Sequence, residues 1–274
     1  MTGAHATWLC AVAVLCLGAA CRPTPGQGGP TSPAAGERDP VDTACRWPAP
    51  PIVEHRDGAG ILLRWQLPAS DVLFQPVLPH HPAFLAYRAT IRADGGALRR
   101  PIADEPVART DQERAIWAKE RANGELAHSG QVGRIAPIQC LDALLFAWQH
   151  QRYSQLDRPT EFIASVLRKS AGDTDQLLVV FGASDQMFPA KAFYGFDVVD
   201  RYRADGWQFW YVLHNHTVQK NGERWALGNP VLSSSDVQLM RNLAAGRGLQ
   251  SARVTNGFYT YSAQAAEFSR LQGR

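Results

Sequence analysis

Two histidines, His214 and His216, are the residues whose type and spacing most clearly suit a chemical role. They end an apolar and aromatic segment, residues 207–216, which predicts a β-strand. Because alternate side chains of a strand lie on the same face, both imidazoles point the same way. Their Cα atoms are then separated by about two strand rises of ~3.3 Å, so both rings can reach one metal ion. Two histidines with this spacing also arise by chance, and a metal site needs a further ligand.

An aspartate further along the chain, Asp236, can supply that ligand. It lies three residues after Ser233, where the apolar spacing of residues 236–245 predicts a helix. Serine at a helix start with an acidic residue three positions later forms a capping box, which by itself only stabilises the helix. A carboxylate in the first turn also lies at the positive end of the helix dipole, which favours the ionised form that binds cations. The sequence is compatible with both roles at once.

A glutamate upstream, Glu161, begins a predicted strand, residues 161–168, in which most other residues are apolar. Taken alone, it is best interpreted as a strand-edge carboxylate that faces water. Taken with the two histidines and the aspartate downstream, it is a candidate general base for a metal-bound water molecule. The combination of these residue types, and no single one of them, indicates a hydrolytic metal site.

These candidate residues resemble the JAMM signature of the JAB/MPN metallopeptidases and occur in its order: Glu161, then His214-x-His216, then Ser233-x-x-Asp236. The similarity extends over roughly residues 142–274. It includes the Pro-Thr-Glu segment at the glutamate, the apolar strand that ends in the histidines, Pro230 shortly before the serine, and the helix after it. The resemblance therefore implies a JAB/MPN-like metallopeptidase domain in residues 141–274.

The resemblance also implies a role for each residue. His214, His216 and Asp236 would bind one Zn²⁺, with water in the fourth position. Glu161 would deprotonate that water, and Ser233 would polarise the scissile carbonyl or hold the developing oxyanion. The implied activity is zinc-dependent hydrolysis of a peptide or isopeptide bond in a peptide or protein substrate.

Two departures from the family pattern leave other hypotheses open. Thr217 stands where many members have proline, and the gap from His216 to Ser233 is longer than the compact spacing of the family. The main alternative is a JAB/MPN-like module that serves as a catalytically silent binding or scaffold lipoprotein of the cell envelope. In a third hypothesis, residues 45–140 bind an envelope partner and the C-terminal part is only structural.

The long gap has a recognisable pattern of its own. Asn221-Gly222 is a strong signal for a two-residue hairpin turn, and Lys220 and Glu223 are placed to pair across it. Because this insertion begins directly after a candidate ligand, we expect residues 218–226 to form a flap that shapes substrate choice. The alternative is a surface excursion without a role.

The rest of the pattern predicts the elements that must position these residues. Short apolar runs bounded by Gly, Pro or Asp predict strands, and apolar residues repeated at three and four predict helices. Further strands are expected at residues 61–67, 84–91, 177–181, 253–255 and 258–261, and further helices at 111–125, 141–153 and 263–271. This order predicts a mixed α/β (α+β) fold. The resemblance implies a JAB/MPN-like mixed sheet flanked by helices, with an additional strand-containing N-terminal region, residues 45–140.

The composition excludes several other classes of protein. The 274 residues include 28 basic and 25 acidic side chains, a net charge of +3, which is too small to indicate nucleic-acid binding. The contiguous His-Asn-His triplet is therefore not interpreted as an HNH nuclease motif. The sequence contains neither a glycine-rich phosphate loop nor a Cys-x-x-Cys pair, so nucleotide-binding and zinc-ribbon classes lack support.

The N-terminus has the pattern of an export signal. Residues 8–20 form an apolar run that ends in small residues directly before Cys21. This pattern predicts a signal peptide in residues 1–21. It also resembles a bacterial lipoprotein signal, in which Cys21 is lipidated and anchors the protein to a membrane. Residues 22–44 are rich in Pro and Gly and predict a disordered linker. The protein is therefore expected in the bacterial periplasm or, as a lipoprotein, on the outer or cell membrane.

If the protein is exported, the two cysteines downstream of the linker, Cys45 and Cys140, enter an oxidising compartment. An oxidising compartment allows them to form a disulfide, which is one possibility. The other is that Cys140, next to Leu141, is only a small core residue. The sequence leaves the distance between them open.

Overall fold

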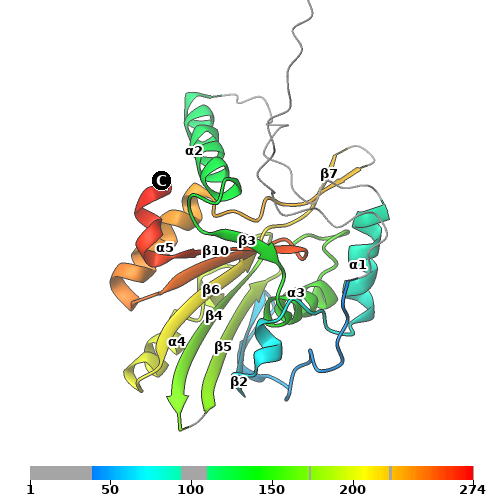
Figure 1. Ribbon diagram of the computed structural model, residues 1–274, viewed down its shortest axis with the longest axis vertical. Helices are drawn as coiled ribbons and strands as arrows, with labels where there is room; N and C mark the ends of the chain where they lie inside the picture. Colours follow the sequence, from blue (N-terminus) through cyan, green and yellow to red (C-terminus); the bar gives the residue numbers. More distant parts are fainter. Residues whose placement is uncertain (1–38, 94–109, 173, 222–223, 274) are drawn as a thin grey trace, which may run out of the picture. The chain divides into compact units, whose positions relative to one another are not determined.

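Figure 1 shows the computed structural model, which describes residues 39–93, 110–172, 174–221 and 224–273. These described residues belong to one compact unit. The expected signal peptide, residues 1–21, and its Cys21 lie outside the described residues, as does most of the expected linker. Within the described ranges, no helix has the length and the apolar character needed to cross a membrane.

The centre of the fold is one eight-stranded sheet (Figure 1). Its neighbouring strands are antiparallel except β6 and β9, which are parallel and are connected through α5 (Ser234–Arg247). Across the sheet the order is β1 (Ile52–Arg56), β2 (Gly60–Pro68), β5 (Thr174–Ser184), β4 (Phe162–Ala171), β6 (Gln208–Asn215), β9 (Ser251–Thr255), β10 (Tyr259–Gln264) and β3 (Arg134–Pro137). The expected mixed α/β class is confirmed.

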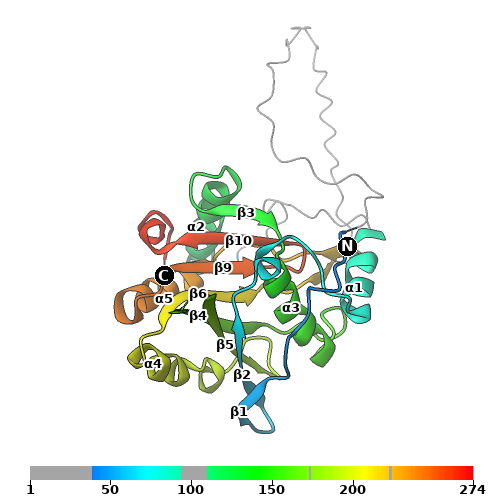
Figure 2. The same ribbon diagram turned by 60° about the horizontal axis from the view of Figure 1, so that its bottom comes forward.

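Alternation along the strands divides the core into two clusters, one on each face of the sheet. In β5, Val179 and Phe181 belong to the first cluster, whereas Leu178 and Val180 belong to the second. Figure 2 shows the helices of the two faces on opposite sides. The first cluster packs against α1 (Pro82–Ala93) and α3 (Cys140–Arg152), and the second against α4 (Phe196–Ala204), α5 and the 3₁₀ helix η3 (Ala265–Arg270). A strand covered on both faces is apolar throughout, as the middle of β5 is.

One expected strand, residues 84–91, is instead part of the helix α1. The buried residues Phe84, Tyr87 and Ile91 are spaced by three and four positions, which places them on one helical face against the first cluster. The strand prediction was wrong because it rested on a short apolar run bounded by Gly, Pro and Asp and not on that spacing.

The other expected elements are present within a few residues of their predicted bounds, including α2 (Asp111–His128). The hairpin at Asn256-Gly257 joins β9 to β10 as expected. The final helix is shorter than predicted, because β10 continues to Gln264 and only η3 follows it. The helix α4 was not predicted from the sequence.

The N-terminal region, residues 45–140, contributes to the same sheet as the C-terminal half. Its strands β1 and β2 form one edge of the sheet, and β3 forms the opposite edge. Its helix α1 covers the face that α3 also covers. The two parts expected from the sequence therefore share one sheet and one core.

A disulfide joins Cys45 to Cys140 at the start of α3, and both residues are buried. Of the two possibilities open from the sequence, the structure has the disulfide.

Asp39, in the expected linker, forms ion pairs with Arg88 and Arg92 of α1 at 2.8 and 2.7 Å. The packed part of the chain therefore begins before residue 45.

The segment that leads into α4 packs closely against Gly182 of β5. The carbonyl oxygen of Phe193, in the 3₁₀ helix η2 (Lys191–Phe193), lies only 1.5 Å from the place of a Cβ atom at position 182. Gly182→Ala is therefore expected to displace η2 and to lower the free energy of unfolding by about 1–3 kcal/mol, measured by chemical denaturation. Gly58→Ala is the matched control, because its added Cβ has no heavy atom within 4 Å. Equal stability of the two variants contradicts this prediction.

Candidate metal centre

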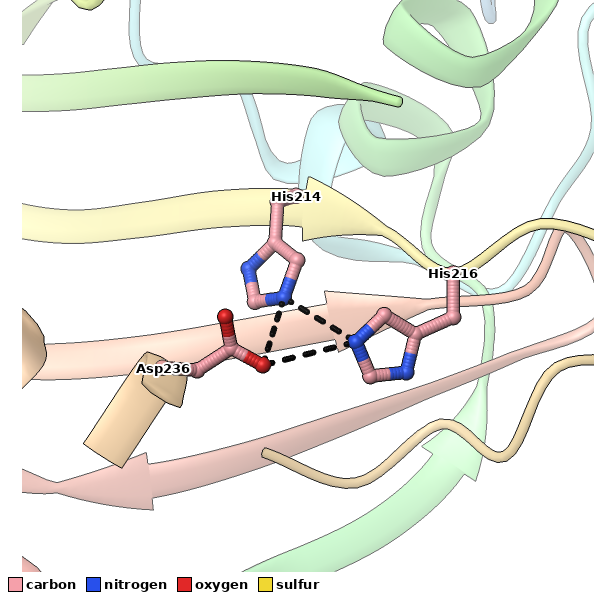
Figure 3. Close-up of side chains that lie close together, drawn as sticks. All are labelled: His214, His216 and Asp236. Carbon is pink, nitrogen blue, oxygen red and sulfur yellow. Dashed lines mark hydrogen bonds and ion pairs between the residues drawn. The ribbon is translucent and has the colours of Figure 1, made fainter. Parts of the chain in front are cut away.

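Three of the candidate side chains meet at one point (Figure 3). His214 lies near the end of β6, His216 follows that strand, and Asp236 lies in the first turn of α5. The Nε2 atoms of the two histidines are 3.3 Å apart. Oδ2 of Asp236 lies 3.3 Å from Nε2 of His214 and 3.4 Å from Nε2 of His216. The three atoms form a nearly equilateral triangle.

This triangle has the size that a tetrahedral zinc site requires. Zinc binds nitrogen and oxygen ligands at about 2.0–2.1 Å, and a tetrahedron of that radius has edges of about 3.3–3.4 Å. The measured separations of 3.3, 3.3 and 3.4 Å equal those edges without any movement of the side chains. Two imidazoles and one carboxylate are also ligands that Zn²⁺ accepts, and three protein ligands leave a fourth position open. The residues present therefore fit a zinc ion.

The hydrogen bond behind His216 directs its lone pair into the triangle. Nδ1 of His216 lies 2.6 Å from the backbone carbonyl oxygen of Asn229. A carbonyl only accepts hydrogen bonds, so Nδ1 carries the proton, and Nε2 of the neutral ring keeps its lone pair. Metal-binding histidines are usually oriented by such a bond from the far ring nitrogen. His216 is thus held in the tautomer that a metal ligand needs.

The charges of the centre favour a cation between these atoms. Burial by itself lowers the pKa of His216, but the hydrogen bond and the charge of Asp236 outweigh it and raise that pKa to about 9. Burial also opposes ionisation of Asp236, yet the two histidines bring the pKa of its carboxyl well below the usual range. In the absence of a metal a proton occupies this place, and a metal ion must displace that proton to bind.

The predicted capping box is present and shares its carboxylate with the centre. The Ser233 hydroxyl accepts a hydrogen bond from the backbone N–H of Asp236 at 3.2 Å, and Asp236 Oδ2 accepts from the backbone N–H of Ser233 at 2.8 Å. A residue that the sequence did not indicate, Glu120 of α2, accepts hydrogen bonds from the backbone and hydroxyl of Ser234 at 2.9 and 2.7 Å. The start of α5, and with it Asp236, is therefore held from two sides.

Glu161 lies beside this centre because of the register between β4 and β6. Ile163 is paired with His214 in that antiparallel ladder, so its extension by two residues places Glu161 opposite His216. The backbone N–H of Glu161 donates to the carbonyl oxygen of Met187 at 2.7 Å, which fixes the residue before β4 begins. Burial raises the pKa of the Glu161 carboxyl, although the nearby charges of His216 and His214 oppose that rise. A half-buried carboxyl with a raised pKa suits a general base.

Tyr194 lies near the centre, and sequence analysis did not identify it. Burial raises the pKa of its hydroxyl, and the charges of Asp236 and Glu161 raise it further, so the hydroxyl lies within electrostatic range of both carboxylates. The backbone N–H of Tyr194 donates to the carbonyl oxygen of Lys191 at 3.1 Å in the turn of η2. No spacing in the sequence connects Tyr194 with the other residues, because only the packing of η2 on β5 brings it there.

The predicted hairpin lies between His216 and the start of α5. Its strands are β7 (Gln219–Asn221) and β8 (Arg224–Ala226), which pair as an antiparallel ladder. The partner of Lys220 in this ladder is Trp225, so the register differs from the expected Lys220–Glu223 pair, and Glu223 itself lies outside the described residues. Val218 is buried in the first core cluster and Trp225 packs against it. The insertion is therefore anchored to the body of the protein at its base.

The cap gives a prediction that separates helix stability from metal binding. Ser233→Ala is expected to lower the free energy of unfolding by about 1 kcal/mol, because the N–H of Asp236 loses its acceptor. Zinc content should not change, since the alanine backbone still donates to Asp236. Denaturant unfolding and metal analysis measure the two effects. Thr110→Ala removes the equivalent cap of α2 and is the matched control; loss of zinc from Ser233→Ala alone contradicts the expectation.

The site residues expected from the sequence converge from three separated parts of the chain. The ligand triangle comes from β6 and α5, the glutamate precedes β4, and the serine caps α5.

Comparison of the chain with protein-family models, with curated proteins and with solved structures finds no match in any of the three.

Proposed function

We propose that this protein is an exported, zinc-dependent metallopeptidase or isopeptidase of the JAB/MPN type. The observation that supports this most directly is the triangle of ligand atoms from His214, His216 and Asp236, with sides of 3.3 to 3.4 Å. This is the spacing of three ligands on a tetrahedral zinc ion with one open position. A mixed sheet with helices on both faces agrees with the JAB/MPN-like fold that the sequence pattern resembles.

Each side chain then has a separate task. Bound zinc would lower the pKa of a water molecule to about 7 and polarise the scissile carbonyl. The Glu161 carboxylate accepts a proton from the attacking water and transfers it to the nitrogen of the leaving amine. The Ser233 hydroxyl already accepts a hydrogen bond from α5, so its own proton is free to be donated to the carbonyl oxygen of the substrate.

Metal analysis of the purified protein tests this proposal. The parent is expected to contain about one zinc per chain and to hydrolyse members of a peptide and isopeptide panel, with activity lost on chelation and restored by zinc. His214→Ala and Asp236→Ala should each lose the zinc, because two ligands hold it far more weakly than three. His55→Ala is the control, since that exposed histidine lies on β1. A parent without stoichiometric zinc removes the proposal.

A catalytically silent binding or scaffold module is the second candidate. One observation favours it: the ion pair between His216 and Asp236 satisfies both charges when the site holds a proton in place of a metal. Such a protein would show no hydrolysis of the panel, and its stability would not depend on zinc. A rise in melting temperature on addition of zinc, together with turnover, excludes this candidate.

The hairpin of β7 and β8 supports a proposal about substrate choice. It follows His216 directly, and it is anchored through Val218 and Trp225. Shortening its tip while keeping both anchors is expected to change the relative rates on different substrates by several-fold and to leave the zinc content unchanged. Competition between pairs of substrates measures this, and an unaltered preference would show that the hairpin has no such role.

We also propose that the protein is exported and anchored to a membrane. The apolar N-terminal run with Cys21 indicates a signal peptide and supports a lipid anchor. The buried disulfide between Cys45 and Cys140 supports an oxidising compartment such as the bacterial periplasm, because disulfides persist there. An enzyme in that place would act on peptide or protein substrates of the cell envelope.

A further inference from the structure

A cavity lies at the sheet edge on the face opposite the candidate metal centre. It has a volume of about 540 Å³. Its walls include Arg56 at the end of β1, Gly60 at the start of β2, and Trp148, Arg152 and Tyr153 at the end of α3. Trp148 packs against the first core cluster, whereas His214 shares a face with Val212 of the second. The cavity is therefore separate from the proposed zinc site.

A cationic side chain in the wall of the cavity, Arg152, has one donor atom without a partner. Nη1 of Arg152 is buried and has no hydrogen-bond partner among the described residues. The guanidinium of Arg152 lies over the ring of Tyr153, 4.8 Å from its centroid. Burial lowers the pKa of Arg152 and the charge of Arg56 also lowers it, whereas Tyr153 and the charge of Asp185 oppose this change. An unpaired, buried N–H of a charged group is costly, so a nearby negative charge would stabilise this guanidinium.

Among the described residues, the acidic residue in the wall, Asp57, forms no ion pair with either arginine. Asp57 Oδ1 accepts hydrogen bonds from the backbone N–H groups of Ala59 and Gly60 at 2.7 and 2.9 Å. Its Oδ2 faces Nε2 of His55 at 3.2 Å. These bonds hold the carboxylate in the turn between β1 and β2. The cavity therefore presents two guanidinium groups, and its single acid is already engaged.

The walls of the cavity also indicate the shape of a ligand that would fit it. The ring of Trp148 is fixed edge-on against Trp65, with centroids 5.5 Å apart, and Tyr153 stands at the end of the same helix. Fixed aromatic walls favour a flat or apolar group, and guanidinium groups favour carboxylates and phosphates, which they can bind through paired hydrogen bonds. The volume of about 540 Å³ falls in the usual range for a small-molecule site, about 300–1,000 Å³.

We propose that this cavity is a binding site for an anionic group, a carboxylate or a phosphate monoester, carried on a planar ring. The guanidinium groups of Arg152 and Arg56 bind the anion, and the ring lies between Trp148 and Tyr153. This proposal does not depend on zinc or on hydrolysis, because the cavity lies on the other face of the sheet.

Calorimetric titration of the purified protein with benzoate, phenyl phosphate and neutral benzamide tests the site. Saturable binding of benzoate or phenyl phosphate is expected, weakening as salt is added, and benzamide should not bind. The stronger of the two anions identifies the group as a carboxylate or a phosphate ester. Removal of one guanidinium, in Arg152→Met or Arg56→Met, should weaken binding at least about tenfold, because a charge-assisted hydrogen bond is lost.

The controls keep the outcome clear. Arg114→Met removes an exposed charge from α2 and should bind the anions as the parent does. Arg56 is exposed at the end of β1, so Arg56→Met tests the site even if Arg152→Met fails to fold. Zinc content should be the same in all four proteins, which separates this test from that of the metal centre. No saturable binding of either anion, or equal binding by the parent and Arg56→Met, overturns the proposal.

Discussion

Glu161→Gln is expected to lower the rate of peptide hydrolysis by about 10²–10⁴-fold while one zinc per chain remains bound. The glutamine side chain has nearly the same shape as the glutamate but cannot take a proton from water. The ligand atoms belong to other residues, so the metal site stays intact. Single-turnover hydrolysis and metal analysis of the same samples measure both quantities.

The matched control for this variant is Glu125→Gln, an exposed change on α2 that should alter neither quantity. Hydrolysis that continues unchanged in Glu161→Gln would show that another group accepts the proton. Parallel loss of zinc and rate would instead show that the carboxylate holds the site together. Only loss of rate with zinc retained agrees with a general base.

The pH dependence of hydrolysis should also show that Glu161 acts as a general base. Glu161 must be ionised to accept a proton, and burial raises the pKa of its carboxyl above the usual value of about 4.3. The rate is therefore expected to fall as the pH decreases through that raised pKa. The acidic limb of the profile should lie above the pH at which an exposed glutamate titrates.

Loss of the disulfide between Cys45 and Cys140 is expected to lower the free energy of unfolding by about 4–5 kcal/mol. The two cysteines are separated by 95 residues, and in the chain-entropy account a loop of this length restricts the unfolded chain strongly. The bond ties Cys45 to the first residue of α3, so it also holds α1 and β2 close to their partners. Urea unfolding with and without reductant measures the difference.

The double variant Cys45→Ala/Cys140→Ala separates the bond from the packing of its sulfur atoms. It should be as unstable as the reduced parent, apart from the small loss of buried sulfur contacts, and insensitive to reductant. A parent whose stability is unaffected by reductant contradicts the prediction. A reduced parent that still binds zinc would show that the bond stabilises the fold without shaping the metal centre.

Much of the fold could be predicted because its elements follow local periods. The apolar stretch of β5 and the Asn256-Gly257 turn between β9 and β10 each depend on residues that are neighbours in the chain. The wrong strand prediction at α1 also arose from relying on residues that are neighbours in the chain. Phe84, Tyr87 and Ile91 form a helical stripe, but a run so short is ambiguous until the face that it covers is known.

The candidate metal centre could be predicted in part for a similar reason. His214 and His216 lie on one face of a strand by alternation alone, and the capping box places Asp236 in the first turn of α5. Glu120 and Tyr194 could not be found in this way. Each reaches the site through the packing of another element, and neither has a characteristic spacing from the ligands.

The sequence by itself determined which residue types were available for chemistry, which strand face carried the histidines, and where α5 begins, because these properties depend on neighbours a few residues apart. Only the tertiary structure decided that the three ligand atoms lie 3.3 to 3.4 Å from one another. It also decided that residues 45–140 share the sheet of the C-terminal half, and that two arginines line a cavity on the opposite face. Such distances follow from strand register and helix packing, which join parts of the chain that carry no local signal of one another.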